Sequence, residues 1–232
     1  LGSRGLGDVY KRQSHDLRTP LTTIAGNASS LLSNGKSFDE QTRYQIYQDI
    51  YNDSVWLNNL VENLLYATRI EEGRMVLNTS TELLADVIDD AVRHVKQHSG
   101  EHSIFVESDD EYILVTADAR LIVQVIINIV DNAVRYTPPG SHITIRSCRE
   151  NNMAVVYIED NGNGISDEDK EHVFDKFYSG TNRIADNRRS IGLGLYLCKA
   201  IIEAHGGTIT VRDNNPAGAV FVFTLPLADN AF

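Results

Sequence analysis

The chain has 232 residues, of which 42% are hydrophobic, and a formal net charge of -11. This length is enough for one good core and a smaller second element, because compact domains usually run about 100 to 200 residues. The acidic balance argues against direct binding to nucleic acid or to an anionic membrane, since both favour clustered Lys and Arg.

The first 13 residues are interpreted as a non-native remnant or a linker. Residues 1–10 carry three glycines where the segment that follows favours helix. We leave them out of the fold prediction and expect the natural chain to continue upstream. No run in the chain approaches the roughly 18 to 20 apolar residues of a membrane helix, so we expect this piece to be soluble as it stands.

Residues 14–73 are predicted to form a helical hairpin. The first helix, residues 14–33, has an apolar stripe at the 4-3-4-3 spacing of a helix that packs on other helices. Turn-forming residues 34–40 follow, with Ser37 or Asp39 as the cap of a second helix that ends near Gly73. The apolar face of this hairpin is too wide for one antiparallel neighbour to cover, which predicts a four-helix bundle formed by a homodimer.

From residue 74 onward, short strands alternate with helices, which indicates an α+β sandwich with helices on one face of a mixed sheet. The expected strands are 75–77, 104–106, 112–116, 142–148, 154–159, 208–212 and 219–225. The expected helices are 81–97, 118–135, 166–173 and 193–204. Strands 142–148 and 154–159 should form a hairpin. The long polar stretch between Tyr178 and Ile191 favours a mobile lid.

A candidate phosphate acceptor lies at the start of the first helix. His15 stands two residues before the stripe position Leu17, so its imidazole should face solvent, where a neutral ring nitrogen can attack a γ-phosphoryl group. Asp16 could hold one ring N–H and take up the developing charge. Thr19 falls on the same helix face as His15 and could position a water. Taken alone, however, an exposed His on a helix is usually an ordinary surface residue, and Pro20 could equally mark a helix start.

Two asparagines stand at i and i+4 on the helix predicted over 118–135. Asn128 and Asn132 therefore share a face, and their amide oxygens could complete the shell of a Mg²⁺ ion that keeps water and ATP phosphate ligands. Arg135, one turn on, could meet phosphate, and Tyr136 could pack on adenine. Asparagines in a buried helix are otherwise members of an ordinary polar network.

Two glycine-rich segments follow. Asp160 ends a predicted strand before Gly162 and Gly164, so its carboxylate would be held beside a backbone that can approach a ligand. The carboxylate could accept a hydrogen bond from the exocyclic amine of adenine, where guanine has a carbonyl. The alternative is a plain Asp-Asn-Gly turn. Residues 192–195, Gly-Leu-Gly-Leu, open a predicted helix whose free N–H groups and dipole favour phosphate.

In this order the motifs resemble those of the sensor histidine kinases. The matches are residues 14–20 to the H box of that family, 128–132 to the N box, 160–164 to the G1 box, 174–178 to the F box and 192–194 to the G2 box. Residues 21–26 and 54–63 further resemble the potassium-responsive KdpD-type sensors.

The resemblance implies a dimerisation and histidine phosphotransfer hairpin over 14–73 and a catalytic ATP-binding domain of the Bergerat (GHKL) fold over 74–232. It implies that His15 is phosphorylated, that Asn132 assisted by Asn128 binds Mg²⁺, and that Asp160 reads adenine. Further nucleotide-binding positions that it implies are Arg135, Tyr136, Gly162, Gly164, Ile165, Lys176, Phe177, Gly192, Leu193, Gly194 and Leu195. Related ATPases of this fold place a water-activating Glu where Asn128 stands, which favours transfer to His15 over hydrolysis.

The implied function is an ATP-dependent protein histidine kinase that passes its phosphoryl group to an aspartate in the receiver domain of a response regulator. Thr19 would serve a reverse phosphatase activity. The implied location is the cytoplasmic portion of a membrane-anchored bacterial sensor, with membrane contact only through the missing upstream region. Two alternatives stay open: a hydrolysing ATPase or kinase of another protein on the same fold, and a catalytically silent dimer that binds nucleotide and signals by docking.

Overall fold

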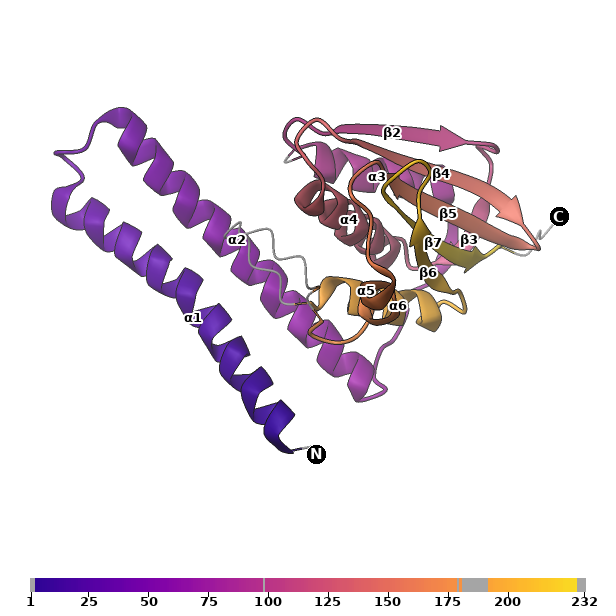
Figure 1. Ribbon diagram of the computed structural model, residues 1–232, viewed down its shortest axis with the longest axis horizontal. Helices are drawn as coiled ribbons and strands as arrows, with labels where there is room; N and C mark the ends of the chain where they lie inside the picture. The colour runs from indigo at the N-terminus through magenta and orange to yellow at the C-terminus, as the bar shows by residue number, and fades with distance from the viewer. Residues whose placement is uncertain (1–2, 98, 179, 181–191, 229–232) are drawn as a thin grey trace. The chain divides into compact units, whose positions relative to one another are not determined.

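The computed structural model describes residues 3–97, 99–178, 180 and 192–228, with side chains from residue 18 onward. They form two compact units, the first ending at Glu71 and the second beginning at Glu72, and each is described by itself (Figure 1). No helix in this part of the chain is long and apolar enough to cross a membrane. The lid predicted between Tyr178 and Ile191 lies outside the described residues.

The first unit is a hairpin of two long helices, α1 (Ser3–Asn34) and α2 (Glu40–Glu71), as predicted. α1 begins at Ser3 instead of residue 14. The helix therefore includes most of residues 1–13, which were left out of the fold prediction. Glycine costs a helix about 1 kcal/mol per residue, but extending an existing helix adds one hydrogen bond for each residue fixed. α1 also runs through Pro20, which excludes Pro20 as a helix start.

The connection between the two helices is fixed by local hydrogen bonds. The Gly35 N–H donates to the Leu31 carbonyl at 2.9 Å and ends α1. The Asp39 carboxylate accepts from the Thr42 N–H at 2.6 Å and caps α2. Of the two predicted caps, the structure therefore selects Asp39.

The hairpin exposes several large apolar side chains. Leu60 and Ala67 of α2 are buried, whereas Tyr44 and Tyr51 of the same helix are 62% and 69% exposed. Among the hairpin side chains that the structure describes, from residue 18 onward, the other exposed large apolar residues are Leu21, Leu32, Tyr47, Val55, Val61 and Leu65. Apolar surface of this extent is typical of a protein contact, which is consistent with the predicted bundle.

The second unit contains a five-stranded mixed sheet in the order β2-β4-β5-β7-β6. Its strands are β2 (Ser103–Ser108), β4 (His142–Glu150), β5 (Met153–Asp160), β6 (Ile209–Asp213) and β7 (Ala219–Pro226). The β2–β4 pair is parallel and the other three pairs are antiparallel. The predicted hairpin of β4 and β5 is confirmed. Its turn is formed by Asn151 and Asn152, which both have positive φ angles. Asparagine tolerates this conformation better than most residues.

Three helices cover one face of this sheet: α3 (Leu84–Lys96), α4 (Ala119–Tyr136) and α6 (Gly194–Ala204) (Figure 1). The core lies between the helices and the alternate strand residues that point toward them, such as Val156, Ile158 and Phe223, each at most 1% exposed. Cys198 of α6 also belongs to this core, and its Sγ lies 3.6 Å from the Val125 carbonyl oxygen of α4. Burial of each large apolar side chain contributes about 1.5–3 kcal/mol.

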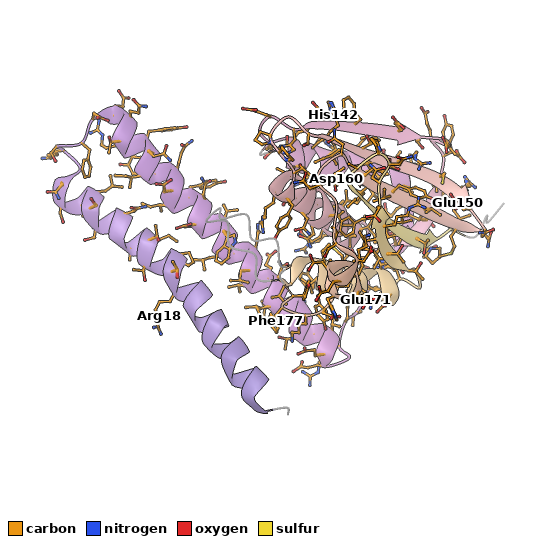
Figure 2. All side chains as sticks on the ribbon, in the orientation of Figure 1. Arg18, His142, Glu150, Asp160, Glu171 and Phe177 are labelled. Atoms are coloured by element: carbon orange, nitrogen blue, oxygen red, sulfur yellow. The ribbon has the colours of Figure 1, made fainter. Side chains whose placement is uncertain are left out.

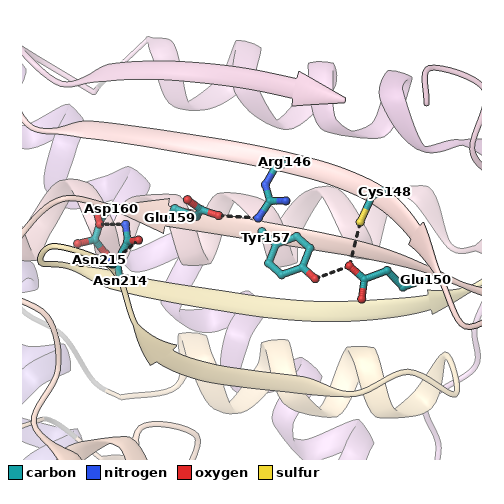
Figure 3. Close-up of polar contacts among 8 residues, drawn as sticks. All are labelled: Arg146, Cys148, Glu150, Tyr157, Glu159, Asp160, Asn214 and Asn215. Carbon is teal, nitrogen blue, oxygen red and sulfur yellow. Dashed lines mark hydrogen bonds and ion pairs between the residues drawn. The ribbon is translucent and has the colours of Figure 1, made fainter. Parts of the chain in front are cut away.

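The opposite face of the sheet carries a small apolar cluster covered by charged side chains. Tyr157 lies at its centre, with the guanidinium carbons of Arg146 and Arg212 at 4.4 and 5.6 Å from its ring centroid. Glu150 accepts hydrogen bonds from the Tyr157 hydroxyl at 2.7 Å and from the Cys148 thiol at 3.3 Å (Figure 3). Burial, with help from Glu150, raises the pKa of the Cys148 thiol to about 11.

Two predicted elements are wrong near the start of this unit. No described strand pairs with residues 75–77, and Val76 is 88% exposed, so the strand expected there does not form. Instead, β1 (Ser80–Leu83) pairs antiparallel with β3 (Leu114–Ala117), and α3 begins at Leu84 instead of residue 81. A strand needs a hydrogen-bonding neighbour, and a three-residue apolar run does not reveal whether one is available.

Candidate active site

Asp160, the last residue of β5, is buried with 8% of its surface exposed (Figure 2). Its Oδ1 accepts hydrogen bonds from the Gly162 N–H at 2.9 Å and the Ala219 N–H at 3.2 Å. Asn214 Nδ2 donates to its carbonyl at 2.7 Å (Figure 3). Burial raises the pKa of the Asp160 carboxyl, and the two backbone donors oppose this shift. No hydrogen bond from a described residue reaches Oδ2, so this oxygen can accept from a ligand.

The turn after Asp160 is packed so closely that its glycines cannot be replaced without displacement. A Cβ on Gly162 would lie 2.5 Å from Thr137 Cγ2, at the C-terminal end of α4. A Cβ on Gly164, which has φ +75°, would lie 3.0 Å from the Gly218 carbonyl oxygen. Asp160 therefore begins an Asp-Asn-Gly turn, which was the alternative interpretation of the sequence. Its carboxylate is also buried, between the end of α4 and the β6–β7 turn.

α4 places Asn128 and Asn132 one helical turn apart, and both are half-buried. Asn128 Oδ1 accepts from Gln124 Nε2 at 3.1 Å, but its buried Nδ2 has no partner among the described residues. The Asn132 side chain likewise makes no hydrogen bond to a described residue. A buried polar atom is rarely left unpaired, so Asn128 Nδ2 fits a ligand that accepts a hydrogen bond, such as a phosphate oxygen. The side-chain oxygens of the two asparagines are the atoms that suit Mg²⁺.

The start of α6 lies against the same asparagine. A Cβ on Gly194 would lie 3.9 Å from Asn128 Cγ. Leu193 occupies the cap position of α6 and, within the described chain, no side chain caps the free N–H groups there. A helix N-terminus in this state is suited to phosphate. Leu193 itself is 2% exposed, so its side chain belongs to the core and its contribution to a ligand is limited to the backbone.

The remaining predicted nucleotide residues lie in the same domain. Arg135 is half-buried and Tyr136 is 45% exposed, at the C-terminal end of α4 and one turn beyond Asn132. Lys176 Nζ lies 5.0 Å from the centroid of the Phe177 ring. Ile165 and Leu195 are half-buried. These positions are compatible with the predicted roles.

The acceptor residues fall within α1, where the backbone separates His15 from Thr19 by one helical turn. Thr19 is half-buried, and its carbonyl accepts from the Thr23 hydroxyl at 3.0 Å. The side chains of His15 and Asp16 lie outside the described part of the structure. The predicted bond between them stays a prediction.

Sequence analysis missed the residues that anchor the N-terminus of α4. Asp118 caps this helix by accepting from the Leu121 N–H at 3.4 Å, and its own N–H donates to His205 Nε2 at 3.0 Å. His205 is buried and its Nδ1 donates to the Ile201 carbonyl at 2.7 Å. An Asp just before a helix is a recognisable cap signal, but nothing local in the sequence connects Asp118 with a histidine 87 residues away.

Two family models match the chain. The His Kinase A (phospho-acceptor) domain matches residues 12–73, which contain His15, Asp16 and Thr19. The Histidine kinase-, DNA gyrase B-, and HSP90-like ATPase domain matches residues 117–229, which contain every predicted nucleotide-binding residue. The chain belongs to the sensor histidine kinases. Its two matched segments follow the order predicted from the motifs, and they correspond to the helical hairpin and the mixed-sheet domain.

Curated relatives of this sensor histidine kinase match most of the chain. Sensor protein KdpD of Clostridium acetobutylicum is 41% identical over 219 residues, which cover 94% of this chain and 24% of that protein. Sensor protein SrrB of Staphylococcus aureus strain MRSA252 is 31% identical over 221 residues, which cover 94% of this chain and 38% of that protein. The chain thus spans less than two fifths of the length of these relatives, and the KdpD match supports the predicted KdpD-type character.

Solved histidine kinase structures share the fold. Acinetobacter baumannii histidine kinase AdeS has a TM-score of 0.70 at 26% identity and covers 93% of this chain and 98% of its own. Histidine kinase ThkA, solved in complex with response regulator protein TrrA, has a TM-score of 0.66 at 27% identity, covering 98% of this chain and 63% of its own. These likenesses extend over both units of the kinase.

Proposed function

We propose that this protein is an ATP-dependent histidine kinase that phosphorylates its own His15 and passes the phosphoryl group to an aspartate in the receiver domain of a response regulator. The observation that carries the proposal is the convergence of two glycine-rich segments on α4. Gly162, beside the buried Asp160, abuts Thr137, and Gly194 abuts Asn128. A buried carboxylate, the side-chain amides of Asn128 and Asn132 and a helix N-terminus are groups that suit adenine, Mg²⁺ and phosphate.

Each group has a distinct role in this proposal. Asp160 Oδ2 accepts from the adenine amine, and Asn132 with Asn128 would hold Mg²⁺, which neutralises phosphate charge when bound. The amides of residues 192–195 bind phosphate oxygens at the N-terminus of α6. Arg135 and Lys176 add positive charge near the phosphates.

The transfer itself uses the hairpin. A neutral ring nitrogen of His15 attacks the γ-phosphorus, so that an N–P bond forms while the bond to the ADP oxygen breaks. Asp16 holds the other ring nitrogen and takes up the positive charge that develops on the imidazole. Thr19, one turn beyond His15 in α1, positions a water for the opposing phosphatase reaction, in which the water attacks the aspartyl phosphate of the regulator and releases inorganic phosphate.

The partners follow from the same proposal. The exposed apolar side chains of α1 and α2 would be covered by a second copy of the hairpin in a four-helix bundle. The ThkA kinase was solved with its response regulator TrrA, which supports a receiver domain as the partner here. The stretch would act as the cytoplasmic portion of a membrane-anchored bacterial sensor, as suggested by relatives that are more than twice its length.

Labelling with [γ-³²P]ATP tests the proposal. The parent chain should gain acid-labile phosphate, His15→Gln should gain none while it still binds ATP, and Asn132→Ala should lose both labelling and binding. Acid-labile phosphate on His15→Gln would refute the acceptor assignment. ATP hydrolysis without labelling indicates a hydrolysing ATPase, and nucleotide binding with neither activity indicates a silent signalling dimer.

A further inference from the structure

The backbone at Phe177 meets the backbone at Gly192, 15 residues further along the chain, at a strained junction. The Phe177 N–H donates to the Gly192 carbonyl at 3.0 Å. Phe177 has φ +65°, an uncommon conformation for a residue with a side chain. Gly192 has φ +69°, and a Cβ there would collide with the backbone of Phe177 and Tyr178. Such strain persists only where the surroundings fix it, so the Phe177–Tyr178 backbone must itself be held.

The side chain of Tyr178 supplies this anchor. Its hydroxyl donates to Asp169 Oδ1 at 2.5 Å, and this acceptance by a carboxylate raises the pKa of Tyr178 to about 12. Its ring lies 5.5 Å from the His172 ring, centroid to centroid. Asp169 is 6% exposed, and a Cβ on Gly180 would lie 3.4 Å from its Oδ2. The phenol is therefore fixed to a buried carboxylate.

The element that carries Asp169 is tied to the sheet. Asp169 belongs to the short helix α5 (Asp167–His172), in which Figure 2 labels Glu171. Lys170 Nζ forms ion pairs with Asp213 of β6 at 2.7 Å and with Asp167 at 2.8 Å. Just beyond α5, the Phe174 ring packs edge-on against Phe221 of β7. α5 thus offers Tyr178 a support that is fixed to the core.

We propose that Asp169 and Tyr178 are positioning residues for the phosphate-binding turn Gly192–Gly194. Asp169 fixes the phenol of Tyr178, the Tyr178 backbone packs against Gly192, and Gly194 opens α6 beside Asn128. Neither side chain needs to touch the nucleotide. The inference rests on the proposed function, in which residues 192–195 bind the phosphates of ATP.

A positioning role predicts a selective defect. Tyr178→Phe keeps the ring against His172 and removes the hydroxyl, so the turn loses its anchor while the adenine contact at Asp160 is untouched. Only part of the lost charge-assisted hydrogen bond is transmitted through the turn to the phosphates, so ADP binding should weaken by about three- to thirtyfold. Adenosine, which has no phosphate, should bind as it does to the parent.

Asp169→Ser removes the same bond from the other side, because its short side chain cannot reach the phenol. It should give the same selective loss of ADP affinity. The double variant should lose less than the sum of the two single variants, because both substitutions break the bond between Tyr178 and Asp169.

Tyr157→Phe is the matched control. Tyr157 also donates its hydroxyl to a carboxylate, that of Glu150 at 2.7 Å. This pair lies on the other face of the sheet, with Glu150 at the end of the strands away from Asp160 (Figure 3). ADP and adenosine affinities should both stay at parental values.

The experiment titrates the full chain and its variants with ADP and with adenosine in the presence of Mg²⁺, with thermal midpoints recorded on the same preparations. Failure of the parent to bind ADP would refute the proposed function itself. The decisive quantity is the ratio of ADP affinity to adenosine affinity. If the parent binds ADP and this ratio is the same in Tyr178→Phe and Asp169→Ser as in the control Tyr157→Phe, the positioning role is overturned. An equal loss of both ligands also overturns it, because the defect is then general.

Discussion

Asp160→Asn isolates adenine recognition from the packing of the turn. Asn has the size of Asp and keeps an oxygen that can accept from the N–H groups of Gly162 and Ala219, which lie 2.9 and 3.2 Å from Oδ1. In place of Oδ2 it presents an NH₂ group, which is a donor. The adenine amine is also a donor, so the substitution removes the contact with adenine and retains the turn.

The size of the effect follows from burial. A hydrogen bond to a charged group contributes about 1.5–3 kcal/mol, and Asp160 is only 8% exposed, so little water competes for its carboxylate. The Kd for ATP should therefore rise by about 10- to 140-fold, since about 1.4 kcal/mol is a factor of ten. GTP should be discriminated against less strongly than in the parent, because the new NH₂ group can donate to the guanine carbonyl.

The free energy of unfolding of Asp160→Asn should not fall, although its affinity for ATP does. Burial raises the folded-state pKa of the Asp160 carboxyl above its unfolded value. The folded state then binds this proton more tightly, and the stabilisation present at low pH is lost as pH rises through the folded pKa. Neutral Asn avoids that loss, so the variant should be at least as stable as the parent near pH 7. The difference should shrink as pH falls toward about 4, the ordinary pKa of Asp.

Calorimetric titration with ATP and GTP, and urea unfolding at several pH values, measure both effects on one preparation. Glu159→Gln is the matched control, because Glu159 precedes Asp160 in β5 and pairs with Arg146 at 3.1 Å on the other face of the sheet. It should bind ATP as the parent does. If Asp160→Asn binds ATP within about twofold of Glu159→Gln, Asp160 does not read adenine.

Two further predictions concern the hairpin. Asp16→Asn keeps the shape of the side chain but removes its charge, so single-turnover autophosphorylation should fall by about 10²- to 10⁴-fold while the affinity for ATP stays unchanged. A rate within threefold of the parent would exclude a role for Asp16 in orienting His15. Thr19→Ala should keep autophosphorylation and slow dephosphorylation of the partner regulator, and an equal loss of both activities would show that Thr19 is only structural.

The predicted elements that the structure confirms are those with a long apolar period. The strands around Val156 could be identified because their buried side chains impose an apolar pattern on the sequence. α1 could be identified because a helix that packs on other helices repeats apolar residues about every three to four positions. Residues 75–77 are apolar enough for a strand but too few to show a repeating pattern, and the strand predicted there does not form. β1 was missed because its formation depends on pairing with β3, more than 30 residues away in the chain.

The site divides in a similar way. Asp160, Gly162 and the asparagines of α4 lie in short motifs, so their residue types and spacing were visible in the sequence. The bonds that fix them, from Ala219 to Asp160 and from Asp118 to His205, join positions 59 and 87 residues apart. Contacts at such separations follow from the fold and leave no local signal. Tyr178 lies in the segment 174–178 that was matched to the F box, but its pairing with Asp169 was missed, because neither residue type signals the other and only their 2.5 Å contact shows the link.

The surroundings of the two cysteines determine how fast their thiols react with oxidants and alkylating reagents in the folded protein. Burial raises the pKa of Cys198 to about 12 and, with the hydrogen bond to Glu150, that of Cys148 to about 11. Because the thiolate is the reactive form, both thiols are protected at neutral pH while the domain stays folded. Modification of either must await an opening of the structure. Cys198 lies between α6 and α4, and Cys148 on the outer face of the sheet, so their modification rates report two different openings.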